Sequence, residues 1–327
     1  MAKKRILSGM RPTGALHLGN LHGALANWKS MQDEYDCFFF VADWHALTTG
    51  WEDTGNVAAS IGEMVTDWLA VGLSPEKCTL FVQSHIKEHA ELFLLLSMLT
   101  PVPWLERNPT YKDQMIQLED KDLSTFGFLG YPVLQAADII MYKAHGVPVG
   151  VDQVPHVELT REIVRRFNNF YGQVFVEPQA VLTETPKILG LDRRKMSKSY
   201  QNAIFLSDPA DVIVKRVGEM ITDPARMRKS DPGDPDICNV FSFHKMYSDA
   251  ATVEEVNREC RVAGIGCVAC KKRMAANLAA WLAPITEERM KIASKPGFVE
   301  EVIADGDARA RKTAQETMEQ VRSAMKI

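Results

Sequence analysis

The sequence predicts an α/β fold, a parallel sheet covered by helices, followed by an all-helical C-terminal domain. Short apolar runs of strand length alternate with segments of helical periodicity over the first 204 residues. A glycine-containing turn joins the first of these runs to the first helical segment. Beyond Ser199 the apolar residues recur almost wholly at helical spacing. Alternating strands and helices imply right-handed crossovers, and therefore a parallel sheet.

Each expected element rests on its own pattern. The run CFFFVA at 37–42 is apolar throughout, which is typical of a strand buried on both faces. Apolar residues at 57–69 recur at helical spacing and stop at Gly72. The expected elements are, in order, a strand at 5–9, a helix from 18–20 to about 35, a strand at 37–42, a helix at 57–69, a strand at 79–83, a polar helical insertion at about 91–130, a helix at 133–144, a strand at 147–149, a helix at 157–167 and a brief extended run at 174–176.

The chain is expected to divide near Phe205. Ser207, Asp208 and Pro209 form a helix-start signal, and the segments that follow are helical. We expect a first domain at 1–204, a helical domain at 205–305 and a C-terminal helix at 306–327 that returns to the first domain.

Composition limits the classes of protein. With 327 residues and 46% hydrophobic content, the chain can bury one large core and a smaller one. The net charge of −4 means that a nucleic-acid partner must be met by local basic patches. No uncharged stretch reaches the 18 or so residues that cross a membrane, and the apolar run behind the charged start is too short for a signal peptide. We therefore expect a cytoplasmic protein whose six cysteines are reduced, ligating or buried.

The turn LSGMRPTGALHLGN, residues 7–20, predicts an anion site. It leads from a strand into a helix, and a helix N-terminus carries unpaired N–H groups and partial positive charge. Gly19 would leave room for a phosphate, and His17 and Asn20 would offer donors to it. The alternative is that His17 packs and Asn20 caps the helix. The turn matches neither the dinucleotide nor the P-loop pattern, so another kind of nucleotide site is needed.

A second segment, KMSKS at 195–199, places two lysines and two hydroxyl groups on an expected loop. Alone, such a run is usually a solvated loop. Together with the TGALHLGN turn, it resembles the two signatures of the class I aminoacyl-tRNA synthetases, with Asn20 where many members have a second histidine.

Three further stretches narrow the resemblance to the bacterial tryptophan-specific branch of that family. They are FVADWHALTT at 40–49, YPVLQAADIIMYKAHGVPVGVDQ at 131–153 and VELTREIVRRF at 157–167. The resemblance covers nearly the whole chain. It implies a Rossmann-like catalytic domain and a helical anticodon-binding domain. It also implies activation of L-tryptophan by ATP, transfer to tRNA(Trp), and a homodimer whose interface uses the insertion.

The resemblance also implies roles for individual residues. Asp138 lies among apolar neighbours, so it must face a cleft or have a buried partner; by resemblance it binds the indole nitrogen, with His45 and Gln153 at the polar end of tryptophan. Lys195, Lys198, His17 and Asn20, with Mg²⁺, would offset charge on the leaving pyrophosphate. Val151 replaces a usual acidic residue, so only its backbone is expected to contribute. The expected ATP site comprises Arg11, Pro12, Thr13, Gly19, Asn20, Gly150, Val151, Asp152, Ile188, Lys195, Met196, Ser197, Lys198 and Ser199.

Four cysteines in the helical part form a candidate metal site: Cys238, Cys260, Cys267 and Cys270. Four thiols suit an iron–sulfur cluster or zinc, and only Cys267 and Cys270 make the short pair typical of zinc. Some bacterial members of the resembling branch carry a [4Fe-4S] cluster on similar spacing, so that cluster is expected. Zinc and unligated thiols are the alternatives. Cys37 and Cys78 read as buried core thiols.

Two other functions stay open on sequence grounds. A tyrosyl-tRNA synthetase shares both signatures, but it normally carries a C-terminal RNA-binding domain for which this chain shows no counterpart. A catalytically silent RNA-binding relative with a redox-sensing cluster would have no need of intact HLGN and KMSKS segments.

Overall fold

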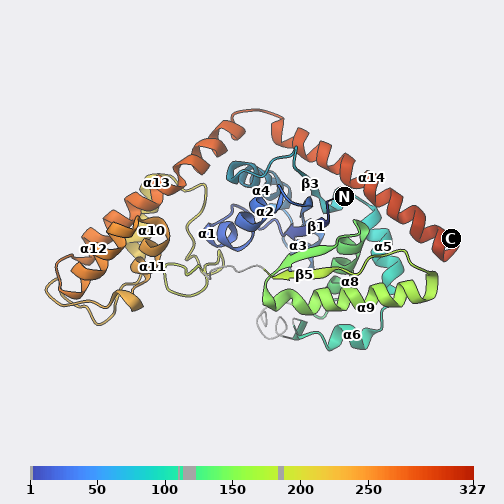
Figure 1. The fold of residues 1–327 in the computed structure, drawn as a ribbon, viewed down its shortest axis with the longest axis horizontal. Helices are drawn as coiled ribbons and strands as arrows, with labels where there is room; N and C mark the ends of the chain where they lie inside the picture. Colours follow the sequence, from blue (N-terminus) through green and yellow to red (C-terminus); the bar gives the residue numbers. More distant parts are fainter. Residues whose placement is uncertain (1–2, 110, 113–122, 183–187) are drawn as a thin grey trace.

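The computed structural model describes residues 3–109, 111–112, 123–182 and 188–327 (Figure 1). Its centre is a five-stranded sheet in the order β3-β2-β1-β4-β5, with every neighbouring pair parallel. The predicted parallel α/β architecture is therefore confirmed. The strands are β1 (Arg5–Met10), β2 (Asp36–Val41), β3 (Cys78–Val82), β4 (Gly146–Val149) and β5 (Gln179–Leu182).

The helix after β1 is divided into three parts. A single turn, α1 (Leu18–Asn20), passes into a π-helical segment, η1 (Leu21–Leu25), and then into α2 (Ala26–Met31). It ends at Met31, short of the expected end near Tyr35. Single π-helical turns inside α-helices often mark functional sites, and here Gly23 and Ala24 of η1 line a cavity that β1 and β4 also line.

Two helices connect the first three strands. The helix α3 (Asp43–Gly50) follows β2 directly and was not predicted, whereas α4 (Val57–Val71) matches its prediction. Gly72 ends α4 in the left-handed region, at φ 105°, where glycine has no Cβ to clash.

The expected insertion contains α5 (Glu88–Ser97) and α6 (Val102–Glu106), and residues 110 and 113–122 lie outside the described part. Next, α8 (Phe126–Met141) runs through Pro132 and begins before the predicted start at 133. The helix α9 (Val154–Tyr171) extends the prediction at 157–167 in both directions.

The prediction of an extended run at 174–176 does not coincide with a strand. The N–H groups of Val174 and Phe175 both donate to Asn168 Oδ1, which folds this segment back onto α9. Phe175 is buried against Phe167, so its apolar character reflects packing under α9 and not a place in the sheet. The strand itself begins at Gln179.

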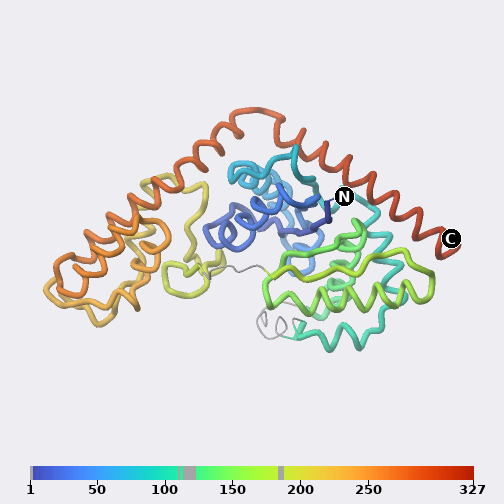
Figure 2. The backbone as a smooth tube through the Cα atoms, viewed as in Figure 1, coloured from blue at the N-terminus to red at the C-terminus, as the bar shows by residue number. Residues whose placement is uncertain are grey.

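The C-terminal part is helical, as predicted. It contains α10 (Ala210–Glu219), α11 (Asn239–Tyr247), α12 (Ala250–Arg261), α13 (Cys267–Ala293) and α14 (Phe298–Met325). In Figure 2, α13 rises from the small helical lobe and α14 then runs back over the sheet domain. The helix α14 contacts β3, α5 and α8 of the sheet domain, and it starts earlier than the expected residue 306.

The helix α14 covers the outer edge of the sheet. A Cβ atom on Gly306 would lie 1.7 Å from the backbone oxygen of Leu80, so only glycine permits this approach to β3. The next residue, Asp307, accepts the Val82 N–H at 3.0 Å. An uncovered edge strand is a template for unwanted pairing, and α14 removes that exposure.

Two apolar clusters fill the two faces of the sheet. One contains Trp28 stacked on Phe39, with ring centroids 4.4 Å apart, and continues through Ile213 and Leu278 of the helical part. The other contains Phe38 and Tyr142 and the inner sides of α8, α9 and α14. Because the first cluster crosses residue 205, the proposed domain boundary lies over a shared core. Among the described residues, no helix is long and apolar enough to cross a bilayer.

Candidate active site

A cavity of about 350 Å³ opens at the carboxyl ends of β1, β2 and β4. It lies where the strand order reverses between β1 and β4, which is where open parallel sheets bind ligands. Its lining includes Gly9, Arg11, Gly23, Asn27, Phe40, His45, Thr48, Tyr131, Gln135, Asp138, Gly150, Gln153 and His156.

The turn after β1 is held by backbone pairing with the start of the helical part. Leu18 N–H donates to the Ile204 carbonyl at 3.0 Å, and Leu206 N–H donates to the Leu16 carbonyl at 2.9 Å. His17 precedes α1, and its backbone N–H donates to Asn20 Oδ1 at 3.0 Å. The side chain of Asn20 therefore caps the helix, as the simpler of the two sequence interpretations expects.

Gly19 has a role that the sequence did not reveal. A Cβ atom there would lie 2.9 Å from Cε1 and Nδ1 of the His17 ring and 3.6 Å from Met196 Cβ. The missing side chain makes room for the His17 ring beneath the second signature. In the described structure the His17 Nδ1 atom is buried without a hydrogen-bond partner.

The second signature lies directly on the first turn. Lys198 Nζ donates to the Thr13 carbonyl at 2.8 Å, and Gly14 beside it has φ +91°. The loop is shaped by Asn202, which accepts the Ser197 N–H at 2.8 Å and donates to Asp192 Oδ1 at 2.7 Å. Asn202 was missed from the sequence; no local pattern marks an asparagine that organises a loop.

The electrostatics of this junction favour binding of anions. Burial lowers the pKa of Lys198 to about 8. Burial, together with the charges of Lys198 and Lys195, lowers the pKa of His17 to about 4. At neutral pH His17 is therefore an uncharged imidazole and Lys198 is still mostly protonated. Two lysines close to a neutral histidine and a helix N-terminus have the chemistry that suits a phosphate chain.

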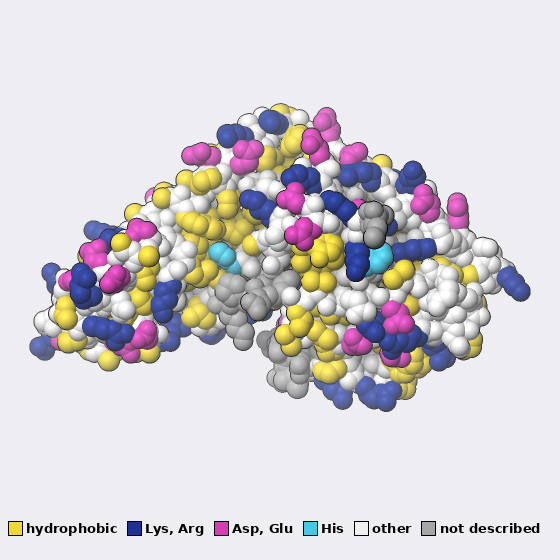
Figure 3. Space-filling model, viewed as in Figure 1, with side chains coloured by type: hydrophobic (Ala, Val, Ile, Leu, Met, Phe, Trp, Pro, Cys, Tyr) yellow, Lys and Arg dark blue, Asp and Glu magenta, His cyan; other side chains and the backbone are white. Residues whose placement is uncertain are grey.

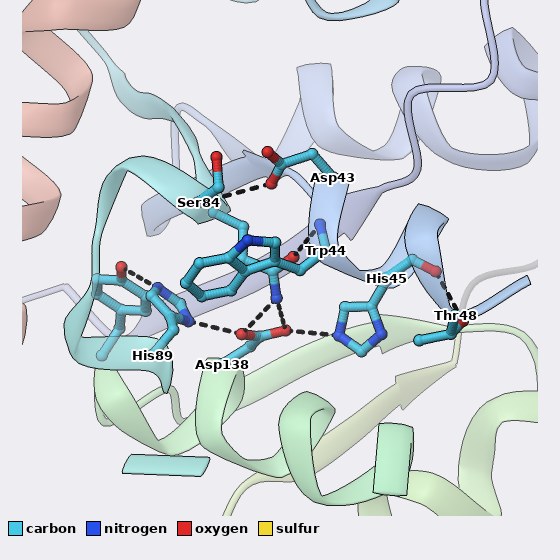
Figure 4. Close-up of polar contacts among 9 residues, drawn as sticks. Asp43, Trp44, His45, Thr48, Ser84, His89 and Asp138 are labelled. Atoms are coloured by element: carbon cyan, nitrogen blue, oxygen red, sulfur yellow. Dashed lines mark hydrogen bonds and ion pairs between the residues drawn. The ribbon is translucent and has the colours of Figure 1, made fainter. Parts of the chain in front are cut away.

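Asp138 of α8 faces the cavity and is also held by buried partners (Figure 4). It accepts hydrogen bonds from His89 Nδ1 at 2.6 Å, from Gln83 Nε2 at 2.8 Å and from His45 Nε2 at 2.8 Å. Burial alone would raise the pKa of Asp138, but the bonds from His45 and His89 outweigh it and lower the pKa. The sequence left two options for this carboxylate, a place facing a cleft or a buried partner. In the structure Asp138 has both.

The partners of Asp138 are themselves anchored. The Trp44 N–H donates to Gln83 Oε1 at 3.2 Å, and His89 Nε2 lies 2.7 Å from the Tyr142 hydroxyl. Nearby, the Ser84 N–H donates to Asp43 Oδ1 at 3.0 Å (Figure 4). These contacts join α3, α5 and α8 around one carboxylate. Gln83, His89 and Tyr142 were missed because they come from three segments with no shared spacing.

A second polar group lies across the cavity. Tyr131 OH and His156 Nε2 lie 3.0 Å apart, and His156 Nδ1 lies 3.1 Å from Asn108 Nδ2. Burial, with repulsion from His45, lowers the pKa of His156 to about 4, so this ring is neutral. Tyr131 and His156 were also missed, although Tyr131 opens one of the stretches that carried the family resemblance and His156 directly precedes another.

The remaining predicted residues fall into two groups. Arg11, Gly150 and Gln153 line the cavity, and Asp152 accepts from Gln153 Nε2 at 2.9 Å and folds against Gly150. By contrast, the side chains of Pro12, Ile188 and Met196 are buried, and Val151 is 77% exposed. Ile188 and Met196 are paired through their backbones, with Met196 N–H donating to the Ile188 carbonyl at 3.0 Å.

The four cysteines approach one another but do not form an assembled metal site. Cys270 lies near enough to Cys238, Cys260 and Cys267 for their charges to add to burial in raising its pKa to about 12. Over the described ranges, however, no group of three or more His, Cys, Asp or Glu side chains is arranged to hold a metal ion. The expected cluster is therefore not confirmed. Cys37 and Cys78 are buried, as predicted.

The parallel-sheet fold, and the contact between the TGALHLGN turn and the KMSKS loop, are those of the class I aminoacyl-tRNA synthetases. Residues 2–283 match the family described as tRNA synthetases class I (W and Y). The chain belongs to this family.

Individual relatives agree. The chain is 53% identical to the tryptophan–tRNA ligase of Thermotoga maritima, over 99% of both chains. It is 45% identical to that of Aquifex aeolicus, over 99% of this chain and 100% of the relative. The tryptophanyl-tRNA synthetase of Campylobacter jejuni complexed with ADP and tryptophan superposes with a TM-score of 0.91 at 32% identity, covering 99% and 100% of the two chains. The predicted enzyme class, an aminoacyl-tRNA synthetase specific for tryptophan, is confirmed by these relatives.

Proposed function

We infer that the chain activates L-tryptophan with ATP and transfers it to the 3′-terminal ribose of tRNA(Trp). The observation that carries this proposal is the contact between Lys198 and Thr13, which brings the two signatures together beside the cavity that contains Asp138. An anion site and a pocket with a buried carboxylate lie side by side, as the joining of ATP to an aromatic amino acid requires.

Asp138 selects the amino acid in this proposal. Its oxygens already accept hydrogen bonds from Gln83, His89 and His45, so an indole N–H would replace one of these donors. His45 is the donor to be replaced, because its side chain is 12% exposed whereas His89 is fully buried. A substrate without an N–H or O–H donor would leave the carboxylate short of a partner. Gln153 is assigned to the polar end of tryptophan, whereas His45, which the resemblance assigns to that end, lies 2.8 Å from Asp138 and therefore at the indole end.

The ATP site extends along the junction of the two turns. We assign the phosphates to the α1 terminus with Thr13, Gly19, Asn20 and Lys198; the contact of Lys198 with Thr13 and that of Asn20 with the His17 backbone support this assignment. Lys195, Ser197 and Ser199 extend this site along the second signature. Gly150 to Asp152 contribute near the ribose, Val151 through its backbone, and Ile188 and Met196 support the adenine side from the core.

The chemistry then depends on positioning and charge. The tryptophan carboxylate is ionised at neutral pH, so it attacks the α-phosphorus without a general base. The bond to the β,γ-pyrophosphate breaks, and Lys195, Lys198, neutral His17 and the helix terminus stabilise the departing charge. Mg²⁺ bound to the ATP phosphates would add to this neutralisation. The ribose hydroxyl of tRNA(Trp) then attacks the carbonyl carbon of the adenylate, so that the tryptophanyl group is transferred to the tRNA and AMP leaves.

The test is tryptophan-dependent exchange of labelled pyrophosphate into ATP by the purified chain. We expect exchange with tryptophan and none above background with tyrosine, followed by charging of tRNA(Trp). Exchange driven by tyrosine would support the tyrosyl alternative. Binding of RNA without any exchange would instead support the silent RNA-binding relative.

We propose that the enzyme is a homodimer that uses the insertion. The helices α5, α6 and α8 pack together and carry exposed apolar side chains, namely Leu94, Met98, Val102 and Phe126. Exposed apolar groups gathered on adjoining helices are typical of an interface. Sedimentation analysis should give twice the 36.6 kDa chain mass, and a monomer at micromolar concentration would contradict the proposal.

We propose further that the four cysteines hold a [4Fe-4S] cluster, with zinc as the alternative. Four thiolates bound to either centre form a net anion, and the chain places a buried cation beside them. Arg226 is 9% exposed, and its Nη1 lies 3.7 Å from Cys260 Sγ. The donor set therefore fits the chemistry of both centres, although its side chains must still rearrange.

The four-cysteine proposal has a direct test. Protein purified without oxygen is expected to be brown, to absorb near 400 nm and to contain about four irons per chain. Colourless protein with one zinc per chain would support the alternative. Protein with neither metal would leave the thiols unligated and end the proposal.

The basic run Lys271 to Arg273 beside them is the candidate contact for the anticodon arm. On the face in Figure 3, acidic and basic side chains are interspersed, so that contact must be local.

A further inference from the structure

A buried carboxylate outside the cavity joins the helical part to the first turn. Asp67 of α4 is 0% exposed. Its Oδ2 accepts the Leu16 N–H at 3.0 Å, and its Oδ1 accepts from Arg289 Nε of α13 at 2.8 Å. Leu16 directly precedes His17, so one carboxylate holds the entry to α1 and the long helix α13 together.

The turn of α13 that carries Arg289 also contacts Leu206, which is hydrogen-bonded to Leu16 through the backbone. Leu16 is bound through its N–H to Asp67 and through its carbonyl to Leu206. The Leu206 carbonyl accepts from Thr286 Oγ1, at 3.4 Å, and Thr286 lies three residues before Arg289 on α13. Both strands of the pairing that sets the direction of α1 are therefore held from one helix of the helical part.

The energetics make Arg289 important to this arrangement. Burial raises the pKa of Asp67, and the bonds from Leu16 and Arg289 oppose that effect. An ionised carboxylate at full burial is costly without a charged partner, so removal of Arg289 leaves Asp67 uncompensated. Arg289 also pairs with Glu63, whose side chain is half exposed.

We propose that Arg289 is a positioning residue for adenylate formation, acting through Asp67 to hold the Leu16 backbone and hence the N-terminus of α1. This inference rests on the proposed function, because it assigns the phosphates to that terminus. The charge that develops on pyrophosphate is met by donors whose placement must be accurate to a fraction of an ångström, and Arg289 helps to provide that accuracy at long range.

The test is Arg289→Gln in the full-length enzyme, assayed by single-turnover adenylate formation. We expect the rate to fall roughly ten- to a hundredfold, with the KM for tryptophan unchanged, because only the phosphate side of the site is displaced. Arg289→Lys keeps a positive charge beside Asp67 and is expected to recover most of the loss. Each variant rate is compared with the wild-type rate of adenylate formation. The proposed function is tested separately, by tryptophan-dependent exchange of pyrophosphate into ATP in the wild-type enzyme.

Two variants on the same helices provide controls. Glu63→Gln breaks the other ion pair of Arg289, and Lys291→Gln breaks an exposed pair with Glu288 one turn back along α13. Both are expected to keep the wild-type rate. If the pair between Arg289 and Glu63 is what sets the rate, Glu63→Gln will lose as much rate as Arg289→Gln, and the proposal is wrong.

A second variant keeps the test open if Arg289→Gln does not fold. Asp67→Asn retains a carbonyl oxygen for the Leu16 N–H but removes the charge that holds Arg289. We expect the same fall in rate and the same unchanged KM for tryptophan. An unaltered adenylation rate in either folded variant overturns the proposal.

Discussion

The ammonium group of Lys198 lies 2.8 Å from the backbone carbonyl oxygen of Thr13, although 185 residues separate them in the chain. Two local turns make this contact possible. Gly14 adopts a left-handed conformation next to Thr13, and Asn202 holds the Lys198 loop in shape through the Ser197 N–H. The protein itself therefore supplies the alignment of its two signature segments.

Removal of the Lys198 charge should slow adenylate formation. In Lys198→Met we expect a loss of about 3 kcal/mol of transition-state stabilisation, because one donor to the leaving phosphates disappears. Single-turnover kinetics at saturating tryptophan measure this loss. Lys215→Met, on the exposed side of α10, is the matched control and should keep the wild-type rate.

The same lysine should give the enzyme a basic limb in its pH profile. Because burial lowers the pKa of Lys198 to about 8, kcat/KM for ATP in the free enzyme should fall as pH rises through that value. An arginine stays protonated far above this range. Lys198→Arg should therefore shift the limb to higher pH, and an unchanged limb would assign it to another group.

Buried neutral histidines should make the fold sensitive to acid. His156 has a folded pKa of about 4, below its ordinary value of 6.5. At pH values between these two pKa values, His156 is protonated in the unfolded chain but neutral in the folded chain. The free energy of unfolding therefore decreases as pH falls through this range, by up to roughly 3 kcal/mol. Urea titrations at pH 7 and 4.5 measure this. His156→Gln should flatten the dependence; parallel curves would contradict the assignment.

Neutralising the pocket carboxylate should weaken tryptophan binding. In Asp138→Asn the new amide N–H groups would face the donors of His89 and Gln83, and the acceptor for the indole would lose its charge. We expect the KM for tryptophan to rise about ten- to a hundredfold with the KM for ATP little changed. Asp43→Asn, which alters another buried carboxylate of the same region, should keep both constants.

The closest approach of α14 to the sheet should tolerate no side chain. In Gly306→Ala the Cβ atom would meet the Leu80 oxygen, and we expect a loss of about 2 to 3 kcal/mol in the free energy of unfolding. In Gly218→Ala, in α10, the new Cβ meets no atom of the described residues within 4 Å, so this variant should be neutral or slightly stabilising. Equal stability of the two variants would show that α14 can shift at no cost.

Much of the fold could be predicted because its strands are local and apolar. The run at 37–42 and the helix ended by Gly72 carry enough pattern in a few residues to identify β2 and α4. The apolar segment at 174–176 suggested an extended run, but Phe175 packs against Phe167 and not against a neighbouring strand. The short helix α3 was missed since its residues follow no simple period; two of them, His45 and Thr48, line the cavity.

The site was predictable only where a motif carried it. The signatures marked Lys198 and His17 as candidates, and the apolar surroundings of Asp138 marked it as unusual. The partners of Asp138 could not be found in this way, because Gln83 and His89 meet it only through tertiary packing. The true neighbour of Gly19, the ring of His17, likewise depends on a rotamer that the sequence does not encode locally.

The placement of α14 along β3 also has a consequence for synthesis. The ribosome makes β3 early and α14 about 220 residues later, an interval of roughly 10 to 40 s at ordinary elongation rates. During that interval the outer strand has no helix over it, and the nascent domain is open to pairing with neighbouring chains. Chaperone demand should therefore be greatest just before Gly306 and Asp307 leave the exit tunnel.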